Sequence, residues 1–199
     1  MRIPKDTALM VIDVQNAIDD PRWGPRNNPD AERKIARLLA AWRGAAMPVI
    51  HIRHDSAEPQ SPYQPGQPGH DFKAEAMPLP GETIVGKQVN SAFIGTGLER
   101  RLNTAGCTTL VVCGVLTHKS VESTVRHAGN LGFRVFVVAD ACWAVETRDL
   151  AGRIWPAGDV HVLSLTHMHG EYAKVTDTRT AMAAANAWTL RGNAETGTT

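Results

Sequence analysis

Residues 109–132, TLVVCGVLTHKSVESTVRHAGNLG, contain the passage from strand to helix that decides the fold. The apolar run 109–113 has the length and composition of a strand that is buried on both faces. Gly114 permits a tight turn, and residues 118–131 form a predicted helix that Gly132 closes. A strand that leads through a turn into a helix is the repeating unit of an α/β protein.

The same alternation continues on both sides of this stretch. We expect further strands at 7–14, 48–53, 83–85, 133–138 and 160–163, and further helices at 28–43, 93–102, 146–154 and, weakly, 181–190. Strands that alternate with helices pair in parallel, and the helices cover both faces of the sheet. The sequence therefore predicts a three-layer α/β/α sandwich with a mainly parallel, six-stranded, Rossmann-like sheet.

Length and composition indicate one ordinary globular domain. The 199 residues are 43% hydrophobic and 21% charged, with a formal net charge of +1. We expect a single domain over residues 1–190 and a polar C-terminal tail over 191–199. The charge balance predicts neither a nucleic acid nor a membrane as partner. Three cysteines without a pairing pattern, and a start without an apolar leader, predict a cytoplasmic protein.

The segment 54–80 is rich in Pro, Gly, Gln and Ser and has no clear period. A loop of this length inside a compact domain is usually functional or disordered. In parallel sheets, ligands bind beyond the carboxyl ends of the strands. We therefore expect the functional residues in this loop, at Asp13, at Lys87, and in the segments 114–120 and 139–143.

Three side chains at these strand ends are candidates, each with a plainer alternative. Asp13 ends an apolar run, where a carboxylate is costly unless it is used or paired, although it could also anchor a loop. Lys87 could support a negative charge, or be a solvated lysine. Ser120 falls in the first turn of a helix, where free N–H groups can stabilise a nucleophile and an oxyanion, or it could simply cap that helix.

Four ordered segments resemble the isochorismatase-like cysteine hydrolase superfamily, of the nicotinamidase and N-carbamoylsarcosine amidohydrolase type. The resemblance extends from about residue 7 to about residue 178 and includes His169-Gly-Glu171. The segments are Val11-Ile-Asp-Val-Gln15; Gly86-Lys87 with Ser91-Ala-Phe93, Gly95, Thr96 and Leu98; Gly114-x-x-Thr117-x-x-Ser120 onward to Gly132-Phe133; and Val137-Val-Ala-Asp-Ala141.

The resemblance implies a hydrolase that cleaves a C–N bond of a small amide, ureide or carbamoyl compound through an acyl-enzyme. Its triad would be Asp13, Lys87 and Ser120, in which the aspartate moves the proton and the lysine supports the aspartate. The N–H groups of Leu116 and Ser120 would form an oxyanion hole. A cis peptide bond between residues 115 and 116 is also implied, with Val115 and Thr117 supporting the loop.

The family pattern has a nucleophilic cysteine where this chain has Ser120. A thiol, with a pKa of about 8.5, ionises readily beside a base, whereas an alcohol must lose its proton during attack. We therefore expect low activity from serine. Three explanations stay open: an engineered cysteine-to-serine change that traps substrate, a natural serine with a different mechanism, and a natural protein that is not a hydrolase. The intact remainder of the site favours the first.

The resemblance also implies a small-molecule substrate and a homo-oligomer, either a dimer or a tetramer, with no cofactor. No His-x-His pattern lies between Asp13 and Lys87, and His51 should point away from the site, so we expect no metal. Each aromatic candidate for a substrate contact has packing under a loop as its alternative. The expected substrate-binding residues are Trp23, His54, Phe72, Phe93, His118 and Trp143.

Two other functions remain alternatives. Isochorismatase-type members hydrolyse a vinyl ether and rely on the aspartate without a covalent nucleophile, which Ser120 permits. Against that function, Arg53 and Lys73 are the only cations near the 54–80 loop that could bind a dicarboxylate. The chain could also be a catalytically silent binding protein. A closed pocket in which Asp13 and Lys87 face Ser120 would argue against that.

Overall fold

The computed structural model describes the backbone of residues 1–196 and the side chains of residues 1–190. Its centre is a six-stranded sheet in the order β3-β2-β1-β4-β5-β8, with every neighbouring pair parallel. This arrangement confirms the predicted parallel α/β sheet. The strands are β1 (Ala8–Ile12), β2 (Val49–His54), β3 (Thr83–Lys87), β4 (Thr109–Val115), β5 (Arg134–Trp143) and β8 (Lys174–Thr176).

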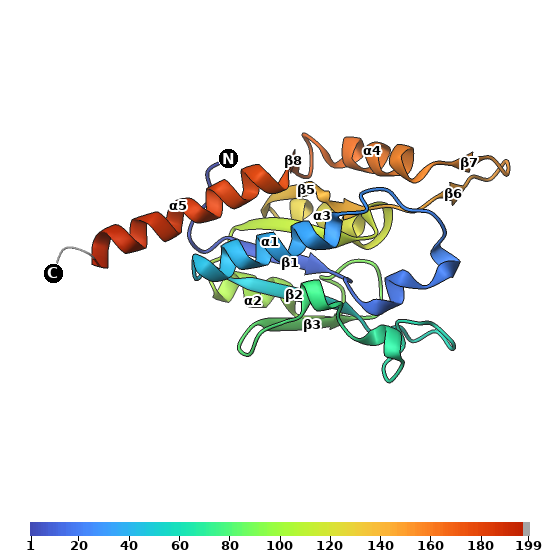
Figure 1. Cartoon of the computed structure of the whole chain (residues 1–199), viewed down its shortest axis with the longest axis horizontal. Coiled ribbons are helices and arrows are strands. Elements are labelled where there is room, and N and C mark those ends of the chain that lie inside the picture. Colours follow the sequence, from blue (N-terminus) through green and yellow to red (C-terminus); the bar gives the residue numbers. More distant parts are fainter. Residues whose placement is uncertain (197–199) are drawn as a thin grey trace.

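Helices cover both faces of the sheet and complete the predicted three layers (Figure 1). Helices α1 (Ala31–Gly44) and α5 (Thr178–Thr196) contact each other, and α1 lies in front of the sheet in this view. Helices α2 (Leu98–Thr104) and α3 (Glu122–Asn130) lie behind the sheet. Helix α4 (Ala157–Met168) contacts α3.

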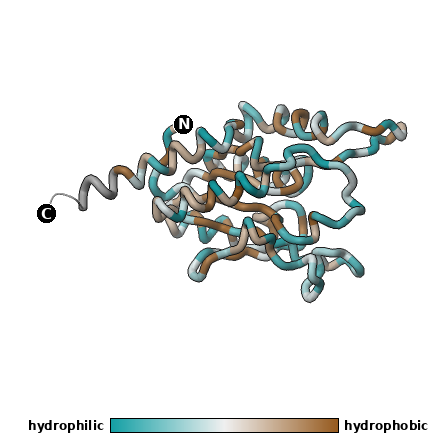
Figure 2. The backbone as a smooth tube through the Cα atoms, in the orientation of Figure 1, coloured by the Kyte–Doolittle hydropathy of each residue, from teal (hydrophilic) through white to brown (hydrophobic). Residues whose placement is uncertain are grey.

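The core lies between these layers. Strands β1 and β4 are buried along their whole length, and the hydrophobic residues of the central strands stand out in Figure 2. Helix α1 adds Ile35, Leu38, Leu39 and Trp42, whose spacing places them on one helical face. Within the described residues, no helix combines the length and apolar character needed to cross a membrane.

The segment 160–163, predicted as the sixth strand, is instead part of helix α4. The buried residues of this helix follow helical spacing, yet two of them are polar, and the apolar Val162 and Leu163 are 62% and 54% exposed. The sequence pattern therefore resembled a short buried strand. The actual sixth strand is β8, which is only 3 residues long. The buried residues of α4 are Ala157, His161, Ser164, Leu165 and Met168.

The segment 146–154, predicted as a helix, forms most of an antiparallel hairpin of β6 (Thr147–Arg148) and β7 (Ile154–Trp155). Local turn chemistry explains the difference. Asp149 Oδ1 accepts hydrogen bonds from the N–H groups of Ala151 and Arg153, both at 2.9 Å. Gly152 adopts a φ of +87°, which suits glycine. Asp149 and Gly152 thus form a turn at positions where a helix was predicted.

Several helix boundaries also differ from the predictions. Helix α2 begins at Leu98 rather than at residue 93, and a π-helical turn, Thr117–Val121, precedes α3. Helix α5 continues to Thr196, so part of the expected C-terminal tail (191–199) is helical in its backbone, while residues 197–199 lie outside the described residues. The remaining short elements are 3₁₀ turns at Asn16–Asp19, Pro21–Trp23, Pro68–His70 and Ala74–Ala76.

Candidate active site

A small cavity lies beyond the carboxyl ends of β1, β2 and β4. Its volume is about 140 Å³, and it brings Asp13 and Ser120 to one space. This is the edge at which α/β sheets bind ligands. The cavity is lined by Asp13, Trp23, His54, Ser56, Glu58, Ser61, Tyr63, Asn90, Val115, Leu116, Lys119 and Ser120.

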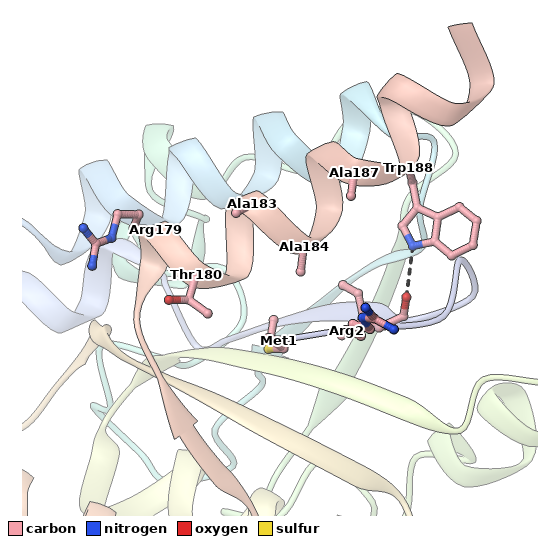
Figure 3. Close-up of a pocket in the computed structure, with 9 residues that line it drawn as sticks. Met1, Arg2, Arg179, Thr180, Ala183, Ala184, Ala187 and Trp188 are labelled. Atoms are coloured by element: carbon pink, nitrogen blue, oxygen red, sulfur yellow. Dashed lines mark hydrogen bonds between the residues drawn. The ribbon is translucent and has the colours of Figure 1, made fainter. Parts of the chain in front are cut away.

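A larger hollow, of about 820 Å³, lies between the N-terminal residues and helix α5 (Figure 3). The indole N–H of Trp188 donates to the carbonyl of Ile3 there, at 3.0 Å. The residues that line this hollow include two arginines and three alanines, but no carboxylate, thiol or imidazole. Its size therefore does not make it the better candidate, because the groups needed for acid–base or nucleophilic chemistry lie in the small cavity.

Asp13 is held in a rare backbone conformation directly after β1. Its φ is +53°, in the left-handed region, where such strain often marks functional residues. The side chain is buried, and Oδ2 accepts a hydrogen bond from Lys87 Nζ at 2.7 Å. The second oxygen, Oδ1, is buried without a hydrogen-bond partner among the described residues. One carboxylate oxygen is thus paired, while the other remains available to accept a proton.

Lys87 ends β3 and is only 2% exposed. Its Nζ lies 2.7 Å from Asp13 Oδ2, 3.2 Å from Ser120 Oγ and 3.3 Å from His54 Nδ1. An ammonium group has three N–H donors, so these three acceptors satisfy it fully. The buried charge of Lys87 is balanced by the Asp13 carboxylate, as a buried charge must be.

Ser120 is positioned by the strand–turn–helix passage that begins at β4. Gly114 has a φ of +121°, and a Cβ on it would overlap the backbone of Ile12 in the neighbouring strand. Glycine is therefore required for β4 to approach β1 this closely. Beyond it, the π-helical turn contains Ser120, and its Val121 N–H donates to the Leu116 carbonyl at 3.2 Å. Such turns are rare and frequently occur at functional sites.

The peptide bond between Val115 and Leu116 is cis. Both residues line the cavity together with Ser120. The backbone N–H groups expected to stabilise an oxyanion therefore belong to residues that border the same space as the Asp13 carboxylate.

Thr117 lies behind the cavity and anchors the loop to helix α4. Its Oγ1 is 2.8 Å from His161 Nδ1, and its carbonyl accepts a hydrogen bond from Ser164 Oγ at 3.1 Å. His161 is buried, and burial lowers its pKa. Neither α4 residue was predicted as part of the site, because the segment 160–163 was interpreted as a strand. Helix α4 thus supports the segment 115–120 through Thr117, which does not itself line the cavity.

The 54–80 loop contributes four residues to the cavity after His54, the last residue of β2. Gln15, fully buried and two residues after Asp13, fixes the start of this loop. Its Oε1 accepts the His54 N–H at 2.8 Å, and its Nε2 donates to the carbonyls of His54 at 3.2 Å and His70 at 2.8 Å. The Tyr63 hydroxyl has a pKa raised by burial. The four loop residues are Ser56, Glu58, Ser61 and Tyr63.

Two of the six expected substrate-binding residues, Trp23 and His54, line the cavity. The Trp23 indole N–H donates to Ala17 O at 2.8 Å, and the Lys119 ammonium lies 5.2 Å from its ring. Burial, followed by the nearby Lys87 charge, lowers the pKa of His54.

The other four, Phe72, Phe93, His118 and Trp143, do not line the cavity. Phe72 packs its ring edge against His51, and Phe93 packs against Phe133. Trp143 is fully buried beneath Arg26, whose guanidinium lies 4.3 Å from the ring.

His118 faces a separate hollow of about 570 Å³ beside α4, and burial lowers its pKa to about 4. The other three side chains therefore pack against neighbours while His118 borders a different hollow, because strand-end position alone does not determine which way a side chain points.

Several cavity residues were missed by the sequence reasoning. Ser56, Glu58 and Ser61 lie in an aperiodic loop, where no pattern shows which side chains turn inward. Gln15 does not line the cavity but holds the loop that does, and it could have been found, since a polar residue close to a buried strand end needs partners. Among the described residues, no group of three or more His, Cys, Asp or Glu side chains is arranged to hold a metal ion.

Comparison with known proteins places residues 7–180 in the isochorismatase domain model. A crystal structure of a protein of the isochorismatase family from Chromobacterium violaceum ATCC 12472 superimposes with a TM-score of 0.92 at 52% identity, covering 94% of this chain and 97% of that one. Among curated relatives, a streptothricin hydrolase from Streptomyces noursei is 39% identical, over 67% of this chain and 48% of the relative. The ureidoacrylate amidohydrolase RutB from Methylobacterium radiotolerans is 28% identical, over 69% and 67%.

Proposed function

The chain belongs to the isochorismatase family of hydrolases, and we propose that it hydrolyses a C–N bond of a small amide, ureide or carbamoyl compound through a serine acyl-enzyme. The observation that carries this proposal is the buried cluster in which Lys87 bonds to Asp13 and Ser120, the two residues that line one cavity. A carboxylate, an ammonium and a hydroxyl in contact are the parts that acyl transfer needs. A relative named as an amidohydrolase supports the choice of bond.

The first half of the reaction forms an ester on Ser120. The Oγ attacks the carbonyl carbon while Asp13 Oδ1, the unpaired oxygen, takes the hydroxyl proton. The carbonyl oxygen becomes an oxyanion, stabilised by the N–H groups of Leu116 and Ser120. When the C–N bond breaks, the protonated Asp13 gives its proton to the departing nitrogen, which leaves as an amine or ammonia.

The second half releases the product. Asp13, again a carboxylate, takes a proton from water as the water oxygen attacks the ester carbon. Collapse of this intermediate breaks the bond to Ser120 Oγ, which recovers the proton and leaves a carboxylic or carbamic acid. Lys87 stays protonated throughout and holds Asp13 and Ser120 in place, because its three N–H groups are all engaged.

The size of the cavity limits the substrate. Its volume of about 140 Å³ is below the range of roughly 300–1,000 Å³ that is typical of ligand pockets. The substrate is therefore a compact molecule whose reactive carbonyl reaches Ser120. Because the site presents an alcohol where a thiolate would react faster, we expect slow turnover.

Intact-protein mass spectrometry after incubation with small amides and ureides tests this mechanism. A transient mass increase equal to the acyl group is expected in the native chain and is absent from S120A. If both proteins show the same adduct, or neither shows one while product still accumulates, the acyl-enzyme is excluded.

The two alternatives have less support from the site. Arg53 is paired with Asp55, and Lys73 is paired with Asp19 and Glu32, so neither cation is free to bind the carboxylates of a vinyl-ether substrate such as isochorismate. For a silent binding protein, no buried Asp–Lys–Ser cluster would be needed. Hydrolysis of isochorismate by S120A at the native rate would favour the vinyl-ether reaction instead.

We further propose that the chain acts on its small-molecule substrate as a homo-oligomer in the cytoplasm, with neither a nucleic acid nor a membrane as partner. The exposed Val162 and Leu163 of α4, which border a hollow with Trp155, support a subunit contact. The three cysteines are free and buried, which suits a reducing compartment. Light scattering coupled to size-exclusion chromatography tests the assembly, and a monomer at micromolar concentration would contradict it.

A further inference from the structure

His54 and Lys87 end two neighbouring strands at the same register. In the parallel pair of β2 and β3, His54 lies directly opposite Lys87. Lys87 O accepts a hydrogen bond from the N–H of Asp55, the next residue, at 2.8 Å. Residues paired across neighbouring strands point to the same face of the sheet. The backbone therefore places the imidazole beside the ammonium, and His54 Nδ1 lies 3.3 Å from Lys87 Nζ.

This contact fixes where the imidazole carries its proton. Lys87 is charged, since it is paired with Asp13 at 2.7 Å, and an ammonium can only donate. His54 Nδ1 must therefore be the acceptor, which leaves the proton of the neutral ring on Nε2. Burial and the Lys87 charge both lower the pKa of His54, which keeps the ring neutral.

The His54 ring also belongs to the lining of the cavity. Within the described residues, no hydrogen bond engages Nε2. The Gln15 side chain bonds to the backbone of His54, and the Tyr63 ring packs against the imidazole in a T-shaped contact with a centroid distance of 5.5 Å. Both contacts restrict the orientation of the ring. The Nε2–H group is thus a donor without a protein partner among the described residues, on a ring that lines the cavity.

We propose that His54 positions Lys87 through Nδ1 and selects the substrate through Nε2–H, which donates to a second carbonyl-type oxygen beside the scissile one. The substrate class is accordingly narrowed from amides in general to compact amides or ureides with a further oxygen acceptor. The proposed contact between Nε2–H and the substrate rests on the proposed function. The proposed positioning of Lys87 by Nδ1 does not depend on it.

The positioning half is tested with S120C as the parent protein, because its thiol can be alkylated by iodoacetamide whether or not any amide is hydrolysed. Asparagine places an amide oxygen near the position of Nδ1, and glutamine places its amide near Nε2. We expect H54A and H54Q to slow alkylation at pH 7 by about threefold or more, because Lys87 moves away from the thiolate, and H54N to restore it to within about twofold. Equal alkylation rates in all four proteins would overturn the positioning role.

The substrate half is tested with two amides of the same shape, acetoacetamide, which has a second carbonyl, and isovaleramide, which has a methyl group there. The S120C parent should prefer acetoacetamide by about tenfold or more in kcat/KM. H54N should lose that preference through KM while kcat stays within about threefold. A preference retained by H54N would overturn the role of Nε2–H. If S120C hydrolyses neither amide, nor any other amide or ureide, the proposed function fails and the substrate half with it, while alkylation still decides the positioning half.

Discussion

The ammonium nitrogen of Lys87 lies 2.7 Å from Asp13 Oδ2, although 74 positions separate the two residues in the chain. Strand β2 lies between the strands that carry them, so the pair spans three strands of the sheet. Both side chains are buried, with side-chain exposures of 0% and 6%. Each of these buried charges is stabilised by the other, because either one alone would be uncompensated in the protein interior.

The first prediction follows from this dependence. Replacing Lys87 by methionine should lower the free energy of unfolding by about 3–5 kcal/mol, because the Asp13 carboxylate is left buried and unpaired. The double variant D13N/K87M should be more stable than K87M alone. Urea denaturation of the single and double variants measures the coupling, and strictly additive losses would contradict it.

The second prediction concerns the close approach of β4 and β1. G114A should destabilise the protein by about 3 kcal/mol or more, because a Cβ there meets the rigid backbone of Ile12 at a positive φ. The matched control is G158A in helix α4, where a Cβ would meet nothing within 4 Å. The control should be neutral or stabilising by about 0.5–1 kcal/mol. Thermal unfolding compares the two, and equal effects would contradict this account.

The third prediction concerns Gln15. Q15L should lower the free energy of unfolding by about 2–3 kcal/mol, because the N–H and carbonyl of His54 lose a buried partner. Q15E keeps an acceptor for the N–H but places a buried carboxylate oxygen against the carbonyl oxygens of His54 and His70, so it should be at least as unstable as Q15L. Urea denaturation would contradict this ranking if Q15L were as stable as the native protein.

The sequence predicted the sheet better than the elements around it. Strands such as β1 and β4 are continuous apolar runs, and their burial on both faces follows directly from that pattern. Helix α4 was missed because His161 and Ser164 occupy buried positions while Val162 and Leu163 face outward. These polar residues are buried because they bond to Thr117 in the turn after β4, a tertiary contact that no local pattern shows.

Within the site, the strand-end rule selected Asp13, Lys87 and Ser120, and the structure brings these three side chains into hydrogen-bond contact through Lys87. The same rule also selected Trp143, which lies at a strand end but is fully buried and does not line the cavity. The loop residues Glu58 and Ser61 depend on the path of an aperiodic segment, so they could not be selected from sequence.

The fourth prediction concerns pH. His118 has a pKa lowered from 6.5 to about 4, so between these values the unfolded chain binds more protons than the folded one. The free energy of unfolding should therefore fall as pH decreases from 6.5 towards 4, with about 1–2 kcal/mol of the loss due to this partly exposed ring. Urea denaturation at several pH values should show a smaller decrease for H118Q, and an unchanged decrease would contradict the assignment.

The most direct test of the central claim is ammonia release by the native chain and by S120C across a panel of small amides and ureides. If the cluster of Asp13, Lys87 and residue 120 performs acyl transfer, S120C should exceed the native chain by about two orders of magnitude or more on at least one compound, because a thiolate is the better nucleophile in this setting. The compound that responds would also identify the substrate class. If neither protein releases ammonia from any compound, the proposed C–N hydrolase function is contradicted.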